Sequence, residues 1–228
     1  MKRLATLILM LCLVALSANA LAQDEEEFEE KDLLEAAIFI GPAIPMGGIT
    51  DWKSTGLLGD TELGTDLGMN FGFDVGYFAT ANMVVGLGFT YSQFGVKSDS
   101  VEVENSKHRF YNAGLYLKYY FFGESSLVPY LKAQVGVDNL KFTTRVQEQN
   151  GNNIVYRELA YDPALSIAAG AGIFYYTHDY GGLYLEVDYH HGFTSDITGS
   201  YQGLEYDFGE TAASVDVRAG VKVFFGND

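Results

Sequence analysis

The stretch GMNFGFDVGYFA, residues 68–79, decides which folds the rest of the chain can adopt. Every second residue in it is apolar: Met69, Phe71, Phe73, Val75 and Tyr77. The residues between them are mostly glycine or polar, and a period of two predicts a β-strand with two unlike faces. In a soluble sandwich the apolar face would form the core, whereas in a membrane barrel it would point outward into lipid.

Seven further stretches show the same period-two character, and no stretch beyond residue 36 shows a convincing helical period. The eight predicted strands are 36–46, 68–79, 82–94, 108–121, 127–140, 163–176, 182–194 and 211–225. Most are longer than a typical soluble strand and suit a tilted membrane strand. Short turns alternate with long polar connections along the chain, which is typical of an up-and-down barrel whose two ends face different compartments.

Glycine and aromatic residues indicate which face is the outside. Glycine recurs on the polar faces, at Gly72, Gly76, Gly86, Gly88, Gly114, Gly136, Gly170, Gly172 and Gly220. It weakens a solvent-facing strand, but small residues are needed inside a narrow barrel. Aromatic residues on the apolar faces concentrate at the strand ends, as in the two girdles of a membrane barrel. The sequence therefore predicts an all-β, eight-stranded antiparallel transmembrane barrel with its polar face inside.

The N-terminus has the three parts of a secretory signal. Lys2 and Arg3 precede an apolar run, and small residues at Ala20 and Ala22 fit cleavage after residue 22. Residues 1–22 are therefore predicted as a signal peptide, and residues 23–35 as an acidic, solvated periplasmic segment. The barrel domain is predicted over residues 36–228.

Composition excludes several partners and sites. The chain contains 14 basic and 30 acidic residues, a formal net charge of −16. Such an acidic chain is not expected to bind nucleic acid or an anionic membrane surface, because both need clustered Lys and Arg. Cys12, the single cysteine, lies in the signal, so neither disulfides nor thiolate metal sites are expected.

Taken together, the signal, the eight alternating strands, the alternating loop lengths and the closing segment VRAGVKVFF (217–225) resemble the OmpA/OmpX-type eight-stranded outer-membrane barrels. The resemblance covers residues 36–225 and implies a monomer in the outer membrane, in contact with its lipid. In this family a terminal aromatic on the last strand is read by the barrel-assembly machinery, and Phe225 matches it. Three further residues follow Phe225, which departs from the family pattern.

The inner faces of the predicted strands carry charges of both signs. They are Asp74, Lys118, Lys132, Asp138, Glu186, Asp188, Asp216, Arg218 and Lys222, with His190 nearby. Unpaired buried charge is very costly, so we expect these residues to form a salt-bridged network that closes the lumen. The alternative is a narrow, gated path for ions or small solutes lined by the same charges.

An enzyme needs a nucleophile, a base and a group that orients the base. The nearest fragment is YHHGFTSD, residues 189–196. Eight-stranded lipid A deacylases place a His and a Ser two residues apart, but Phe193 stands two residues after His191. We therefore expect no catalytic residues, no cofactor and no metal, and a protein that is not an enzyme; a lipid A-modifying enzyme is kept as an alternative.

The long loops are predicted to face outward from the cell. Trp52 in the first, with Tyr201 and Tyr206 in the last, are candidate contact residues for an extracellular ligand or a host surface. The predicted function is therefore envelope integrity, or adhesion and ligand contact through surface loops. A narrow porin-like channel for small solutes is the main alternative, and a soluble lipocalin-like barrel is a further one.

Overall fold

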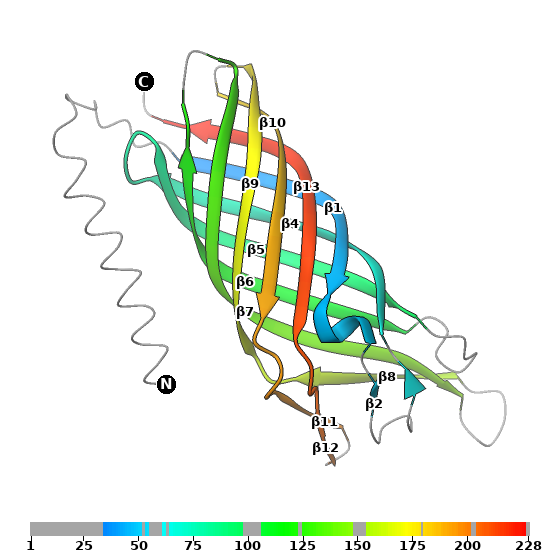
Figure 1. The fold of residues 1–228 in the computed structure, drawn as a ribbon. Helices are drawn as coiled ribbons and strands as arrows, with labels where there is room; N and C mark the ends of the chain where they lie inside the picture. The colour runs from blue at the N-terminus through cyan, green and yellow to red at the C-terminus, as the bar shows by residue number, and fades with distance from the viewer. Residues whose placement is uncertain are drawn as a thin grey trace, which may run out of the picture.

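The computed structural model describes residues 34–51, 53–54, 61–62, 64–97, 106–122, 125–147, 154–178, 180–201 and 204–226. They form a closed antiparallel β-barrel of eight strands (Figure 1). The wall strands are β1 (Leu34–Met46), β4 (Thr65–Phe78), β5 (Met83–Val96), β6 (Lys107–Tyr120), β7 (Leu127–Gln147), β9 (Ala164–His178), β10 (Gly181–Gly192) and β13 (Ala212–Phe225). Pairing of β1 with β13 and of β7 with β9 completes the ring.

Shorter elements lie between the wall strands. They are the 3-10 helix η2 (Gly47–Asp51) and the strands β2 (Lys53–Ser54), β3 (Thr61–Glu62), β8 (Ile154–Tyr161), β11 (Thr198–Tyr201) and β12 (Leu204–Asp207). No helix in the described part of the chain is both long and apolar enough to cross a membrane.

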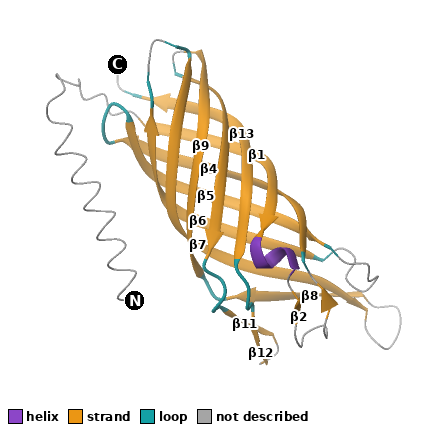
Figure 2. Cartoon of the chain, in the orientation of Figure 1, coloured by secondary structure: helices purple, strands orange, loops and turns teal. Residues whose placement is uncertain are grey.

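Strand β7 continues past the barrel, and three short strands extend the same sheet from its end; this extension is here called the outer sheet (Figure 2). In it β8 pairs with the end of β7, β11 pairs with β8, and β12 pairs with β11. The prediction that β7 ends near residue 140, with loop beyond it, was wrong. Leu140 and Phe142 of β7 and Leu159 of β8 are apolar and buried, and they pack in one cluster with residues of the barrel wall, so this part of the chain stays extended.

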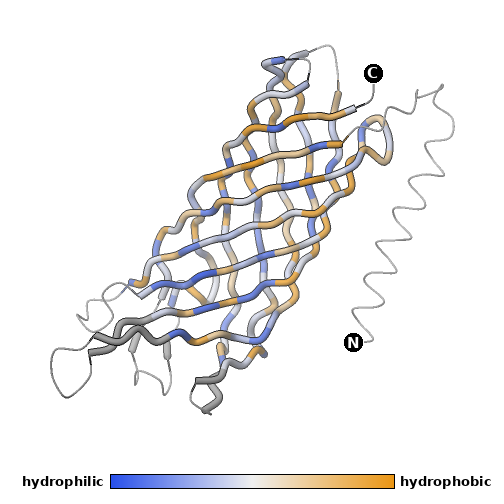
Figure 3. Tube along the Cα trace, turned by 180° about the vertical axis from the view of Figure 1, so that it is seen from behind, coloured by the Kyte–Doolittle hydropathy of each residue, from blue (hydrophilic) through white to orange (hydrophobic). Residues whose placement is uncertain are grey.

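The wall strands confirm the predicted direction of the two faces. Apart from the end of β7, they begin and end within three residues of the predicted positions. In β4, Phe71 is 51% exposed and Asp74 is 2% exposed, so the apolar face of the opening stretch is the outside. Figure 3 shows hydropathy changing repeatedly along the strands. Such a wall suits a lipid environment for two reasons. Its outward side chains are apolar, and the closed ring pairs the backbone N–H and C=O groups within the wall.

The two predicted aromatic girdles also point outward. Near the short turns the exposed aromatic residues are Tyr77, Tyr119, Phe121, Tyr175 and Phe225. Toward the long loops Phe71, Tyr91 and Tyr111 lie in one row across β4, β5 and β6, where they are direct cross-strand partners. Aromatic residues at two levels are what a barrel needs to hold both interfaces of a bilayer.

Inward-facing glycines let neighbouring strands and large side chains approach closely. A Cβ added at Gly72 would lie 2.0 Å from the carbonyl oxygen of Phe89 and 2.6 Å from Cζ of Phe39. Outward-facing Gly95, near the end of β5, has nothing within 4 Å of the same position. The sequence analysis expected small residues on the inner face, and these close contacts explain why a glycine is needed at position 72.

Gly72→Ala is expected to destabilise the barrel by about 1–3 kcal/mol, the usual cost of overpacking. Gly95→Ala, the matched control, should change stability by less than about 0.5 kcal/mol. Urea unfolding of the refolded proteins in detergent micelles, followed by far-UV circular dichroism, measures both. Equal midpoints for the two variants would contradict the close packing at Gly72.

Candidate functional site in the barrel interior

The barrel interior is filled by layers of side chains stacked along its axis. Nearest the short turns is an inner aromatic layer, made of Phe39, Phe78, Tyr116, Tyr120, Tyr130, Phe174, Tyr184 and Phe224. Its rings touch across strands, with centroids 5.1 Å apart for Tyr120 and Tyr130 and 5.3 Å apart for Phe174 and Phe224. This layer fills the short-turn end of the lumen.

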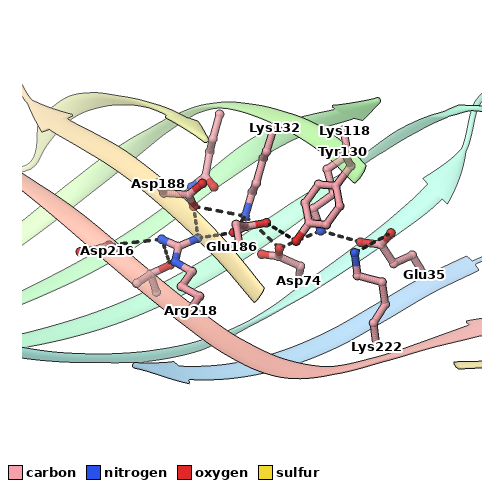
Figure 4. A network of polar contacts seen from close by, with 12 residues as sticks. Glu35, Asp74, Lys118, Tyr130, Lys132, Glu186, Asp188, Asp216, Arg218 and Lys222 are labelled. Carbon is pink, nitrogen blue, oxygen red and sulfur yellow. Dashed lines mark hydrogen bonds and ion pairs between the residues drawn. The ribbon is translucent and has the colours of Figure 1, made fainter. Parts of the chain in front are cut away.

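A central charge network lies among and beyond these rings. It consists of Glu35, Asp74, Lys118, Lys132, Glu186, Asp188, Asp216, Arg218 and Lys222, and Figure 4 shows the side chains pointing toward one another. Each is between 0% and 4% exposed. Five carboxylates face four cations, so the network is close to neutral, as charges in a low-dielectric interior require.

Lys118 organises the half of the central charge network nearer the short turns. Its Nζ lies 2.5 Å from Oε1 of Glu35 and 3.0 Å from Oδ2 of Asp74. Nζ of Lys222 lies 3.8 Å from Oε2 of Glu35 and 4.2 Å from the ring centroid of Tyr130. Tyr120 donates its hydroxyl to Glu35 and accepts a hydrogen bond from Lys222. Aromatic faces thus supplement the single carboxylate that Lys222 reaches.

Arg218 organises the other half. Its guanidinium lies 2.5 Å from Asp188, 3.2 Å from Glu186 and 3.3 Å from Asp216. Lys132 joins the two halves, because its Nζ lies 2.9 Å from Asp74 and 3.4 Å from Glu186. The guanidinium has five donors in a planar fork, which suits it to three carboxylates better than an ammonium.

Asp138 is the one predicted member that the described contacts place elsewhere. It lies 2.8 Å from Nε2 of His190 and accepts a 2.7 Å hydrogen bond from Nδ2 of Asn112. Asn112 also contacts Ser166 and Gln134, at 2.9 Å and 2.6 Å. This polar group forms a separate cluster on the long-loop side of Arg218.

A cavity of about 20 Å³ lies beside the Asp138 cluster, which is room for about one water molecule. Above it an outer apolar layer covers the lumen, formed by Ala43, Ile49, Phe94, Phe110, Leu140, Phe142, Leu159, Tyr161, Ala164, Ile197, Phe208 and Ala212. The described interior is therefore filled from the inner aromatic layer to the outer apolar layer, with a cavity too small for a solute.

Glu35 is a network residue that the sequence did not predict. It follows an acidic run and was assigned to the solvated segment 23–35, but β1 begins at Leu34 and Glu35 is fully buried. The sequence does contain a pattern that indicates this role, since Glu35, Ala37 and Phe39 continue the inward-facing alternation of β1. Charge density in the preceding residues concealed it.

The remaining predicted residues that the structure describes lie at or beyond the ends of the barrel. Trp52 is outside the described residues, and the backbone places Tyr201 on β11 and Tyr206 on β12. Phe225 is the last residue of β13 and faces outward. His191, near the end of β10, contacts Phe193 just beyond it, with ring centroids 4.9 Å apart.

The described residues contain no group of three or more His, Cys, Asp or Glu side chains placed to hold a metal ion. The acids of the central charge network are occupied by Lys and Arg instead. The chemistry that this arrangement supports is electrostatic closure.

Comparison with known proteins establishes the fold. No family model matches the chain, and neither does any curated protein. Outer membrane protein OprG from Pseudomonas aeruginosa matches with a TM-score of 0.53 and 17% identity, covering 86% of this chain and 97% of that one. Outer membrane protein AlkL matches with a TM-score of 0.50 and 18% identity, covering 90% and 94%. The chain has the OmpA/OmpX-type eight-stranded outer-membrane barrel fold, and this fold supports the predicted outer-membrane localisation.

One expectation is corrected by these matches. We expected that the protein is not an enzyme, yet the similar folds include the outer membrane protease OmpT from Escherichia coli, with a TM-score of 0.44 and 11% identity, covering 89% of this chain and 99% of that one. The expectation that the protein is not an enzyme is therefore withdrawn. A match this distant assigns no activity to this chain either.

Arg218→Gln is expected to destabilise the protein by about 3–5 kcal/mol, because it leaves three buried carboxylates with fewer partners. Arg109→Gln is the matched control, since Arg109 is partly exposed and lies 3.9 Å from Glu158. Loss of such a surface pair costs at most about 1 kcal/mol. Urea unfolding of both refolded variants tests this, and similar losses would show that the interior pairs are not special.

Proposed function

We propose that this protein is an outer-membrane barrel with a closed lumen, which acts through its extracellular surface by contact with a ligand or a host surface. The observation that carries the proposal is the central charge network. Its cations and carboxylates are paired across the lumen, and the inner aromatic and outer apolar layers lie at its two ends.

Closure is supported by the cost of opening. An ion passing along the axis would have to separate contacts such as Arg218 with Asp188 and Lys132 with Asp74, at 2.5 Å and 2.9 Å. Separation leaves charges unpaired where few waters can solvate them. Eight strands also enclose only enough space for the side chains that fill it.

Surface contact is supported by the outer sheet. It extends the barrel wall beyond the long-loop end, where a membrane no longer covers it (Figure 1). Its base is anchored: Tyr161 packs edge-on against Phe208 at 5.1 Å, and the amide of Phe208 donates to the carbonyl of Ile197 at 3.0 Å. An anchored sheet presents contact residues at a small entropic cost on binding.

The first test is conductance of the refolded protein in a planar lipid bilayer. The wild type is expected to give no steady current. Glu186→Gln combined with Arg218→Gln keeps the net charge but removes contacts at the centre of the network, so brief openings are expected in that variant. A steady, ion-selective current through the wild type would contradict closure and assign a channel function.

The second test shortens the β11–β12 hairpin. Residues 198–207 are replaced by Asn-Gly, a two-residue turn suited to join antiparallel strands, which keeps the contact between Ile197 and Phe208. Cells expressing this variant should lose most adhesion to cultured epithelial cells while keeping wild-type resistance to detergent. Loss of detergent resistance with unchanged adhesion would instead favour a role in envelope integrity.

A further inference from the structure

The outer wall carries a row of polar and basic residues directly above the aromatic row. Tyr91 pairs with Tyr111 across β5 and β6, and their rings are 5.0 Å apart. Two residues further along the same strands, Gln93 pairs with Arg109, and Arg109 pairs with Lys141 of β7. Lys107 lies two residues before Arg109 on β6, on the same outward face, and is opposite Thr143. We call Lys107, Arg109 and Lys141 the basic patch.

Cations are strongly segregated in this chain. Eight Lys and Arg side chains are described: Lys97, Lys107, Arg109, Lys118, Lys132, Lys141, Arg218 and Lys222. Four of them belong to the central charge network. The other four lie together on or beside the outward faces of β5, β6 and β7. Among the described side chains, the outward faces of β1, β4, β9, β10 and β13 carry none, in a protein whose net charge is −16.

The level of the basic patch matters as much as its charge. The tyrosine row marks the extracellular interface of the membrane, because aromatic girdles lie where hydrocarbon meets headgroups. Side chains two residues further along a strand lie about 7 Å beyond that row. The basic patch is therefore at the depth of the headgroups and faces lipid.

The basic patch retains free positive charge. Glu158 of β8 lies 2.7 Å from Lys141 and 3.9 Å from Arg109, so one carboxylate serves two cations. Lys107 forms no ion pair with a described residue, and Nε of Arg109 has no hydrogen-bond partner among them. The three cations and Glu158 together carry a formal charge of about +2.

We propose that the basic patch binds the phosphorylated headgroup of an outer-leaflet glycolipid. Arg offers a planar fork that matches phosphate oxygens, and Lys adds point charges around it. Lipid tails fit the apolar wall below, where Leu87, Leu115 and Val135 form one row across β5, β6 and β7. A lipid is therefore held at both ends, by phosphate at the basic patch and by acyl chains on the wall. This site borders β8, where Lys141 pairs with Ala160, but it includes no residue of the β11–β12 hairpin.

The test places the full mature protein in phosphatidylcholine nanodiscs with a small fraction of bisphosphorylated lipid A as the probe. Native mass spectrometry counts the lipid A retained per barrel as the probe concentration is varied. Lys107→Gln, Arg109→Gln and Lys141→Gln combined should weaken retention on the order of 100-fold, since each cation near an anionic lipid surface contributes about fivefold. Wild-type protein should retain lipid A stripped of its phosphates far more weakly.

Two further variants separate binding from misfolding. Glu158→Gln removes the carboxylate that competes for Lys141 and Arg109, and should tighten retention several-fold. Lys107→Arg with Lys141→Arg keeps the charge and should retain the probe like wild type. Equal retention by wild type and the triple Gln variant, or equal retention of phosphorylated and stripped lipid, would overturn the proposal. Displacement by millimolar inorganic phosphate would overturn the assignment to a lipid.

Discussion

The structure depends on one constraint: nine charged side chains are buried inside a ring of strands and must be paired there. Their partners come from six different strands, β1, β4, β6, β7, β10 and β13. Glu35 reaches Lys118 across the lumen, and Arg218 gathers Glu186 and Asp188. These contacts form only when the ring is closed in this register. A slip of one residue would turn a strand's charges toward lipid, so pairing and closure enforce each other.

The same constraint separates the two surfaces of the wall by role. Inside, packing and pairing leave room for about one water molecule beside the Asp138 cluster. Outside, the wall has to satisfy only lipid, and the β11–β12 hairpin contributes no described residue to the layers that fill the lumen. Residues such as those of β11 and β12 can therefore change without disturbing the central charge network. Segments that tolerate sequence change in this way are the ones that can acquire residues for contact with a partner.

Sequence periodicity predicts the strands and the direction of each face, because alternation is local and can be read from neighbouring residues. The fold, the inward glycines and all but Glu35 of the central charge network were accessible in this way. The pairing of individual charges could not be predicted in this way, since Lys132 and Asp74 come together only through the register of strands that are distant in sequence. The outer sheet was missed because its polar composition resembles loop. The basic patch was missed for the same reason as the charge pairs, since Arg109 and Lys141 meet only across β6 and β7.

The cations of this acidic chain follow one rule on both sides of the wall. Inside, Lys118, Lys132, Arg218 and Lys222 lie where the protein supplies carboxylates. Outside, Arg109 and Lys141 share a single carboxylate, so the remaining counter-charge has to come from the surroundings. At the depth fixed by the row of Tyr91 and Tyr111, those surroundings are lipid headgroups. The aromatic row and the basic patch together then fix the height of the barrel in the membrane, and with it the height at which the outer sheet is presented.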